Sequence, residues 1–275
     1  MDYIYSIIYG IIQGISEWLP ISSTGHLILA ENLFPMNVTD EFFKMFEVVI
    51  QLGSILAVLI LFWSKLCPVG YKKTEGFTLK KETFNLWGKV VVGIIPAMIL
   101  GLLLDEFTDK IEQNFVIATT LILYGVLFIV VEHLNKKRET KINSLEDISY
   151  RLALCVGAFQ ALALIPGTSR SGATILGAII LGFYRPVAAE FSFFLAVPTM
   201  FGASFLRVLG FIKDGAAISQ HEIIILVIGT IVSFLVSVLA IKFLMSFIKK
   251  KDFVPFGYYR IVLGILVLAL PLLVK

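Results

Sequence analysis

The stretches QGISEWLPISSTGH (residues 13–26) and QALALIPGTSRSGAT (residues 160–174) place polar residues inside otherwise apolar sequence. We call them polar segment 1 and polar segment 2. Hydrocarbon tolerates neither unpaired backbone groups nor unpaired charge, so such segments persist at membrane depth only where protein or a water-filled cavity surrounds them. Together they contain a carboxylate, a histidine, several hydroxyls, a guanidinium and glycines, which indicates a functional site.

The composition around these segments is typical of a polytopic membrane protein. Of the 275 residues, 58% are hydrophobic and 16% are charged, whereas soluble domains carry about 25% charged residues. The net charge of +3 is small and gives no indication of nucleic-acid binding. The sequence starts without a basic region, so we expect its first stretch to be mature structure rather than a signal peptide. Six apolar stretches are long enough to cross a hydrocarbon core of about 30 Å: 43–63, 84–104, 114–134, 188–210, 222–247 and 256–274.

The two stretches that contain the polar segments, 2–30 and 151–183, are predicted to form hairpins. In the second stretch, the apolar halves on either side of the polar break are each too short to span a membrane alone. Short halves around a polar break indicate a helical hairpin that enters and leaves on one side. For residues 1–30, a single crossing with a cytoplasmic N-terminus is the alternative.

Loop charges predict the orientation. Lysine and arginine gather in three loops, which the positive-inside rule assigns to the cytoplasm: 64–83, 135–151 and 248–252. They are scarce in the loops 31–42, 105–113 and 211–221, which we expect outside. With two hairpins and six crossings, the N- and C-termini are both predicted outside.

An internal repeat predicts how the two halves are related. Gly10-x-x-Gln13 followed by Pro20-x-Ser22-Ser23 recurs as Gly157-x-x-Gln160 followed by Pro166-x-Thr168-Ser169. Three predicted spans follow each polar segment, so we expect a single transmembrane domain, 1–275, built from units of about 1–134 and 150–275. An odd number of spans inverts the second unit, and inverted repeats place sites near the membrane midplane. The predicted fold class is an all-α polytopic membrane protein with two re-entrant hairpins and six spanning helices.

The residue types in the polar segments predict an anion site. Ser22 or Ser23 is placed to cap a helix that follows Pro20, and the free N–H groups at a helix start bind anions. Gly167, Thr168 and Ser169 precede a second such helix, expected to begin near Ala173. Arg170 adds a forked cation suited to phosphate oxygens.

A carboxylate accompanies these anion binders. Gln13 and Glu17 are four residues apart and share one face of a helix. Glu17 suits a metal ligand or a proton-handling group better than a direct phosphate contact. A structural ion pair between Glu17 and Arg170 is the alternative interpretation. Gln51, in the middle of the span 43–63, either lines the cavity or joins two helices.

At these residues the chain resembles the undecaprenyl-diphosphate phosphatase family, the bacitracin-resistance type. That family carries an (E/Q)xxxE motif, a Ser-Ser-Thr-Gly-His stretch and a PGxSRSxxT motif, found here at Gln13–Glu17, Ser22–His26 and Pro166–Thr174. The resemblance covers essentially the whole chain. It implies a hydrolase of the bacterial cell membrane that converts undecaprenyl diphosphate to undecaprenyl phosphate and inorganic phosphate, recycling the lipid carrier for cell-wall synthesis. It also implies dependence on a divalent cation, Mg²⁺ or Ca²⁺, and bacitracin tolerance when the protein is abundant.

We therefore predict phosphoryl transfer to Ser23 or to a metal-activated water. Arg170 and the two helix starts are expected to hold the diphosphate, and His26 to take a proton. Glu17, helped by Gln13, is expected to bind the cation or to orient His26. Further hydrogen bonds to substrate are predicted from the remaining polar residues: Ser22, Thr24, Gly167, Ser169, Ser171, Thr174 and Gln51.

The second candidate function is a lipid-phosphate flippase or transporter, because inverted repeats with broken helices are transporter architecture. Such a protein would move its substrate without releasing phosphate. The combination of Glu17, Ser23, His26 and Arg170 is richer than anion binding requires, which favours the hydrolase. Membrane lipids are expected partners, and a homo-oligomer is left open.

Overall fold

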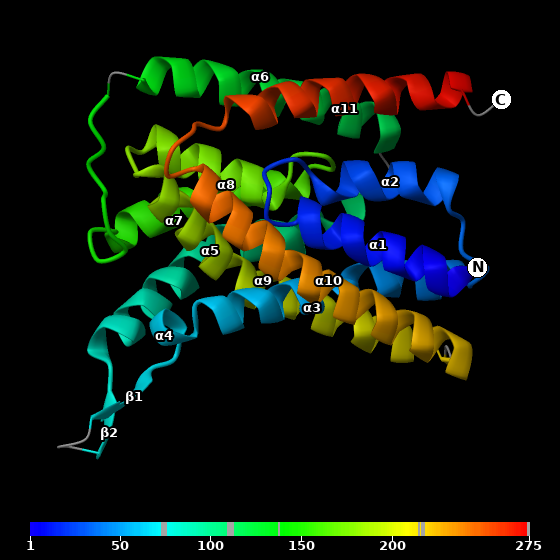
Figure 1. Ribbon diagram of the computed structural model, residues 1–275, viewed down its shortest axis with the longest axis horizontal. Coiled ribbons are helices and arrows are strands. Elements are labelled where there is room, and N and C mark those ends of the chain that lie inside the picture. Colours follow the sequence, from blue (N-terminus) through cyan, green and yellow to red (C-terminus); the bar gives the residue numbers. More distant parts are fainter. Residues whose placement is uncertain (73–75, 109–112, 137, 214, 216–217, 274–275) are drawn as a thin grey trace.

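The structure is a computed structural model that describes residues 1–275 except 73–75, 109–112, 137, 214, 216–217 and 274–275. The described chain is helical apart from one antiparallel strand pair (Figure 1). Its elements are α1 (Asp2–Ser16), α2 (Ser23–Leu33), α3 (Asp40–Leu61), α4 (Trp63–Leu66), β1 (Val69–Lys72), β2 (Gly76–Leu79), α5 (Lys81–Thr108), α6 (Gln113–Asn135), α7 (Tyr150–Ala161), a 3-10 turn (Leu162–Leu164), α8 (Arg170–Ile180), α9 (Arg185–Lys213), α10 (Gln220–Phe247) and α11 (Val254–Leu273).

Five of these helices, α3, α5, α6, α9 and α10, are long and apolar enough to cross a membrane. The prediction of an all-helical polytopic membrane protein is confirmed, and five of the six predicted spans fall on these helices. The sixth, 256–274, falls on α11, of which the described part, Val254–Ala269, forms a shorter apolar helix; residue 274 lies outside the described residues. The strand pair β1–β2 was not predicted and lies within the lysine-rich loop 64–83.

The connections gather at two ends of the molecule (Figure 1). The strand pair, the segment between α6 and α7 and the connection between α10 and α11 lie toward one end. The N-terminus and the connection between α2 and α3 lie at the other end. All three predicted lysine-rich loops therefore share one end of the structure.

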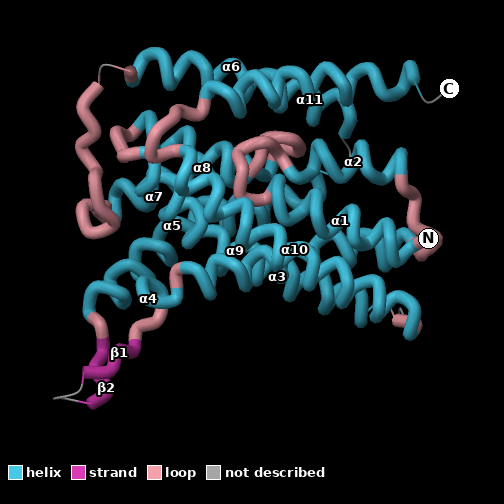
Figure 2. Tube along the Cα trace, viewed as in Figure 1, coloured by secondary structure: helices cyan, strands magenta, loops and turns pink. Residues whose placement is uncertain are grey.

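The two polar segments form turns in the interior of the helical array (Figure 2). From its turn, the α1–α2 pair extends toward the end that holds the N-terminus, whereas the α7–α8 pair extends toward the opposite end. Glycines allow these helix pairs to reach the interior of the array, because they let helices approach closely. A Cβ atom on Gly157 of α7 would lie 1.9 Å from the carbonyl oxygen of Gly93 in α5, and one on Gly14 of α1 would lie 2.8 Å from that of Ser233 in α10.

The short helices α2 and α8 correspond closely. Each has 11 residues, and α8 begins at Arg170, 147 residues after α2 begins at Ser23. Gln13 and Gln160 share this spacing. The residues before the two helices, Ser22 and Ser169, both adopt positive φ, 74° and 69°. The structure thus matches Ser22 with Ser169, not Ser23 with Ser169 as the motif spacing indicated. It also starts α8 three residues before Ala173, because Ser169 supplies the cap.

Candidate functional site

The polar segments meet at a buried ion pair between Glu17 and Arg170. Glu17 follows the last residue of α1, and Arg170 is the first residue of α8. Nη2 of Arg170 lies 3.1 Å from Oε1 of Glu17, and the two side chains are 11% and 8% exposed. The other carboxylate oxygen, Oε2, accepts a 2.8 Å hydrogen bond from Nε2 of Gln13. The predicted shared face of Gln13 and Glu17 is confirmed by this contact.

Arg170 is held from three sides. Besides its contact with Glu17, Nη1 donates to the carbonyl oxygen of Ser192 in α9 at 2.8 Å. The guanidinium carbon lies 5.5 Å from the ring centre of Trp18, which is fully buried. The buried Nε atom has no hydrogen-bond partner among the described residues. The guanidinium therefore has a fixed orientation, and its Nε donor is without a partner among the described residues.

The hydroxyls of polar segment 2 hold the protein together at this point. Ser171 donates to the carbonyl oxygen of Glu17 at 3.0 Å, which links α8 to the end of α1. Thr174 donates to the carbonyl oxygen of Arg170 at 2.9 Å, and its hydroxyl lies 2.5 Å from that of Ser192. Ser169 accepts from the N–H of Gly172 at 3.1 Å. These three residues were predicted to bind substrate, and the structure gives their hydroxyls partners within the protein.

Polar segment 1 leaves two hydroxyls open. Ser22 accepts from the N–H of Gly25 at 3.4 Å and is the N-cap of α2. Ser23, the first residue of α2, is half-buried, and Thr24 is exposed. No side-chain hydrogen bond of either residue is found in the described part of the chain. Because the first N–H groups of a helix lack intrahelical partners, the start of α2 presents free donors beside these hydroxyls.

His26 has no hydrogen bond to Ser23 or Glu17 in the structure, and its predicted role as the proton acceptor stays a prediction. Nδ1 lies 2.7 Å from the carbonyl oxygen of Ser22, and Nε2 lies 2.7 Å from the hydroxyl of Tyr259 in α11. The two rings stack at 5.6 Å between centres with an interplanar angle of 8°. Since a carbonyl only accepts, Nδ1 carries the proton and Nε2 of the neutral ring is the basic atom.

Sequence reasoning missed Tyr259 and Arg260. Arg260 lies on α11, is 0% exposed, and donates to the carbonyl oxygens of Pro20, Gly167 and Thr168 at 3.2, 3.1 and 3.0 Å. The signal was present, because a charged residue within a predicted span is functional by default. Arg260 lies within the predicted span 256–274.

Two other predicted residues lie apart from the ion pair. Gly167 has φ +82°, and a Cβ atom there would clash with Oγ1 of Thr120. This position therefore requires a glycine for its backbone conformation and its packing. Gln51 is half-buried on α3 and forms no hydrogen bond with the other predicted site residues. Its predicted role in substrate binding stays a prediction.

The donor set around Glu17 suits a cation shared with a phosphate, not a cage made of protein alone. Within the described ranges, no group of three His, Cys, Asp or Glu residues could hold a metal ion. Glu17 offers a carboxylate, and Oε1 of Gln13 is buried without a partner among the described residues. Mg²⁺ is commonly bound by one or two carboxylates together with substrate phosphates.

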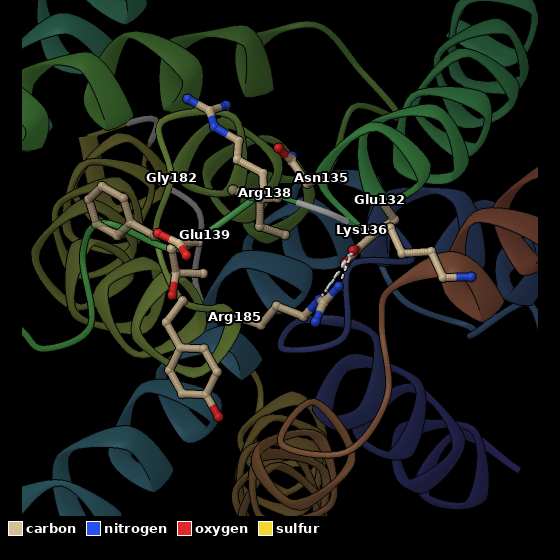
Figure 3. A pocket seen from close by; sticks show the side chains of 11 residues that line it. Glu132, Asn135, Lys136, Arg138, Glu139, Gly182 and Arg185 are labelled. Carbon is tan, nitrogen blue, oxygen red and sulfur yellow. Dashed lines mark hydrogen bonds and ion pairs between the residues drawn. The ribbon is translucent and has the colours of Figure 1, made fainter.

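A cavity of about 130 Å³ lies elsewhere, at the end of the molecule that carries the lysine-rich loops (Figure 3). It is lined by residues of α6, α9 and their neighbouring loops, including Lys136 and Arg138. Arg185 and Glu132 form an ion pair there at 2.5 Å. No predicted site residue lines this cavity, and the Arg185 side chain of this ion pair is 33% exposed.

The fold and the site define a class: a polytopic helical membrane protein in which two helix starts and a carboxylate–guanidinium pair meet between the spanning helices. A sequence model of the family described as bacitracin resistance protein BacA matches residues 6–266, and the chain belongs to this family. The resemblance stated from the motifs is thereby confirmed.

Curated relatives are similar over nearly their full length. An undecaprenyl-diphosphatase of Acetivibrio thermocellus is 54% identical over 268 residues, covering 97% of each chain. One of Enterococcus faecalis is 56% identical over 263 residues, covering 95% of this chain and 94% of the relative. One of Latilactobacillus sakei subsp. sakei is 49% identical over 269 residues, covering 98% and 97%.

Proposed function

We propose that the protein is an undecaprenyl-diphosphatase, a hydrolase of the cell membrane that converts undecaprenyl diphosphate to undecaprenyl phosphate and inorganic phosphate. This reaction recycles the lipid carrier for cell-wall synthesis and links the protein to bacitracin resistance. Relatives about 50% identical over nearly the whole chain carry that name. The structural observation that carries the proposal is the contact between Arg170 and Glu17 where two capped helix starts converge.

We propose that the α1–α2 and α7–α8 pairs are re-entrant hairpins in two inverted units, about 1–134 and 150–275, with six spans in all. The equal lengths of α2 and α8 and their matching serine caps support this arrangement. The lysine-rich end is then cytoplasmic by the positive-inside rule, and both termini are outside. The site lies near the midplane, where the two turns meet.

In the proposed mechanism, Arg170 and the free N–H groups of α2 and α8 bind the diphosphate. Phosphoryl transfer consists mostly of positioning and charge stabilisation, and helix starts and guanidinium groups supply both. The Ser23 oxygen attacks the terminal phosphorus while the bond to the bridging oxygen breaks, so undecaprenyl phosphate leaves with the bond's electron pair. Water then hydrolyses the phosphoserine and releases inorganic phosphate. Attack by water directly on the diphosphate is the alternative.

His26 accepts the Ser23 proton at Nε2. This atom is the basic nitrogen of the ring, because Nδ1 donates to the Ser22 carbonyl. The hydroxyl of Tyr259 occupies Nε2 in the structure, so it must yield this position when Ser23 approaches. Trapping of a phosphoserine at position 23 tests the covalent route, and full activity of Ser23→Ala rules it out.

We also propose that Glu17 and Gln13 would hold a divalent cation, Mg²⁺ or Ca²⁺, when the diphosphate is bound. When bound, it would neutralise charge on the phosphate oxygens. Hydrogen bonds from Gln13 and Arg170 hold the Glu17 carboxylate in place. Chelation of the purified protein should abolish phosphate release, and re-addition of the cation should restore it.

The discriminating experiment places the purified protein in lipid vesicles with a long-chain prenyl diphosphate. Release of inorganic phosphate that scales with protein supports the hydrolase. Movement of the lipid between leaflets without phosphate release would instead establish the flippase. A matched sample with Arg170→Ala separates a specific effect from contaminating phosphatase, because that variant removes the proposed anion binder.

A further inference from the structure

We propose that Arg260 is a positioning residue of the site. It joins the turns of the two polar segments, and its positive charge, which Glu17 does not neutralise, is available to attract the diphosphate. The inference rests on the proposed function for its substrate, but not for the contacts between the turns. Arg260 belongs to α11, far in sequence from both polar segments.

The guanidinium reaches both turns at once. Nη1 donates to the carbonyl oxygen of Pro20 at 3.2 Å, in polar segment 1. Nη2 donates to the carbonyl oxygens of Gly167 and Thr168 at 3.1 and 3.0 Å, in polar segment 2. These carbonyl groups lie in breaks between helices, where backbone groups need other partners. Arg260 therefore supplies the donors that the two breaks share.

Arg260 also lies against the start of α8. A Cβ atom on Gly172 would be 3.0 Å from Nη1 of Arg260. Gly172 is the residue whose N–H is capped by Ser169. The Arg260 guanidinium is thus next to the first turn of a helix whose N–H groups are proposed to bind phosphate, and the missing side chain of Gly172 leaves room for it.

The charge of Arg260 is not neutralised by a carboxylate. In the described part of the chain, ion pairs join Glu17 to Arg170, Glu132 to Arg185, Glu190 to Lys65 and Asp2 to His221, and none includes Arg260. The side chain is 0% exposed, and its other charge-stabilising contact is the ring of Tyr124, 5.4 Å from the guanidinium carbon. Burying an unpaired charge is costly.

The polar segments contain one carboxylate, Glu17, and it is occupied by Arg170. With Arg260 included, the site has two cations and one anion, which leaves a net positive charge. A diphosphate is the ligand chemistry that such a site complements. Because of this charge, the site still attracts an anion although Arg170 is paired with Glu17.

Two substitutions separate the roles of geometry and charge. Arg260→Met removes both the donors and the charge. Arg260→Lys keeps the charge, but its single ammonium does not reproduce the fork that serves the two turns. Arg185→Lys is the control, because Arg185 is a half-buried arginine that also makes several hydrogen bonds, here to Glu132 and away from the site.

The first readout is hydrogen exchange of the full-length protein in detergent, measured by mass spectrometry without substrate. We expect faster exchange in peptides that cover residues 19–25 and 166–172 in both Arg260 variants, by about tenfold or more. Arg185→Lys should leave these peptides as in the wild type. Unchanged exchange in both turns of either folded Arg260 variant would overturn the joining role.

The second readout is kinetic. We expect kcat/KM to fall by about 10- to 100-fold in both Arg260 variants. KM should rise in Arg260→Met and stay closer to the wild-type value in Arg260→Lys, because lysine keeps the charge. Equal KM values for the two variants would overturn the electrostatic role. Absence of phosphate release by the wild type would contradict the proposed function instead, and the exchange experiment would still decide the role of Arg260.

Discussion

At the scale of single residues, Glu17 and Arg170 form an ion pair that joins two distant parts of the chain. A buried ion pair adds little net stability, because the loss of hydration offsets much of the attraction. Removing one partner is worse, since the other charge is left buried. The pair is therefore better explained by what its guanidinium and carboxylate do for a ligand than by a contribution to folding.

Arg170→Lys should lower kcat/KM by about 100-fold, because the loss of one or two charge-assisted hydrogen bonds costs about 1.5–3 kcal/mol each. Nη1 and Nη2 contact Ser192 and Glu17 simultaneously, and one ammonium cannot do so in the same geometry. The measurement is steady-state phosphate release. Arg185→Lys, which alters the half-buried pair with Glu132, should stay within about threefold of the wild type; equal losses in both variants would contradict the assignment.

Part of the site could be predicted from the sequence. Glu17 and Arg170 stood out because charge is expensive inside a membrane, and the spacing from Gln13 to Glu17 fixed their common face. The partner of His26 could not be predicted, since Tyr259 lies 233 residues away and its position depends on helix packing. The hydroxyls of Ser171 and Thr174 were identified as polar site residues, but only the folded contacts reveal that they bond to the protein.

At the scale of elements, the site depends on two short helices with unusual caps. Ser22 and Ser169 adopt positive φ, a conformation that costs a non-glycine residue about 1–2 kcal/mol. Their hydroxyls cap the N–H groups of Gly25 and Gly172. We infer that serine suits these positions because the cap offsets the strain, and because the turn brings the free N–H groups together.

Ser169→Ala should destabilise the protein by about 2 kcal/mol, since it loses the cap and keeps the strained backbone. Ser169→Gly should cost less than about 1 kcal/mol, because glycine accepts positive φ. Reversible unfolding in mixed detergent measures both. At Ser149, the N-cap of α7 with φ −80°, the difference between the alanine and glycine variants should be smaller. A difference as large at Ser149 as at Ser169 would contradict this explanation.

The sequence also predicted most of the elements. Apolar stretches of about 20 residues located five spanning helices, and the polar breaks located both turns. The start of α8 and the strand pair β1–β2 were not predicted. Local hydrogen bonds determine both features. The Ser169 cap sets the start of α8, and backbone pairing of Val69–Lys72 with Gly76–Leu79 forms the strands. Neither kind of hydrogen bond leaves a clear hydropathy pattern.

At the scale of the whole molecule, the loops divide into two ends (Figure 1). At the end that holds the N-terminus, Asp2 contacts two other segments. Its carboxylate accepts a hydrogen bond from the N–H of Asn37 at 3.2 Å and lies 3.0 Å from Nε2 of His221. These contacts lower the pKa of the Asp2 carboxyl. The opposite end carries the lysine-rich loops, and the polar turns lie between the two ends.

This division predicts which residues are accessible from outside the cell. In a protein with Cys67 and Cys155 replaced by alanine, Glu41→Cys should react with a membrane-impermeant maleimide in intact cells. Lys250→Cys should react only after the membrane is permeabilised. Both positions are exposed in the structure, so a lack of labelling cannot come from burial. Labelling of Lys250→Cys in intact cells would reverse the proposed orientation.

The most direct test of the site is phosphate release from a long-chain prenyl diphosphate by the full-length protein in bilayers. It compares the wild type with Glu17→Gln, both in the folded state. Glutamine keeps the shape of Glu17 but removes the charge that Arg170 and Gln13 hold. Glu190→Gln, which alters a partly exposed ion pair with Lys65 near the start of α9, is the control. We predict a loss of at least about 100-fold for Glu17→Gln and a change within about threefold for Glu190→Gln. Wild-type release by Glu17→Gln would contradict the account.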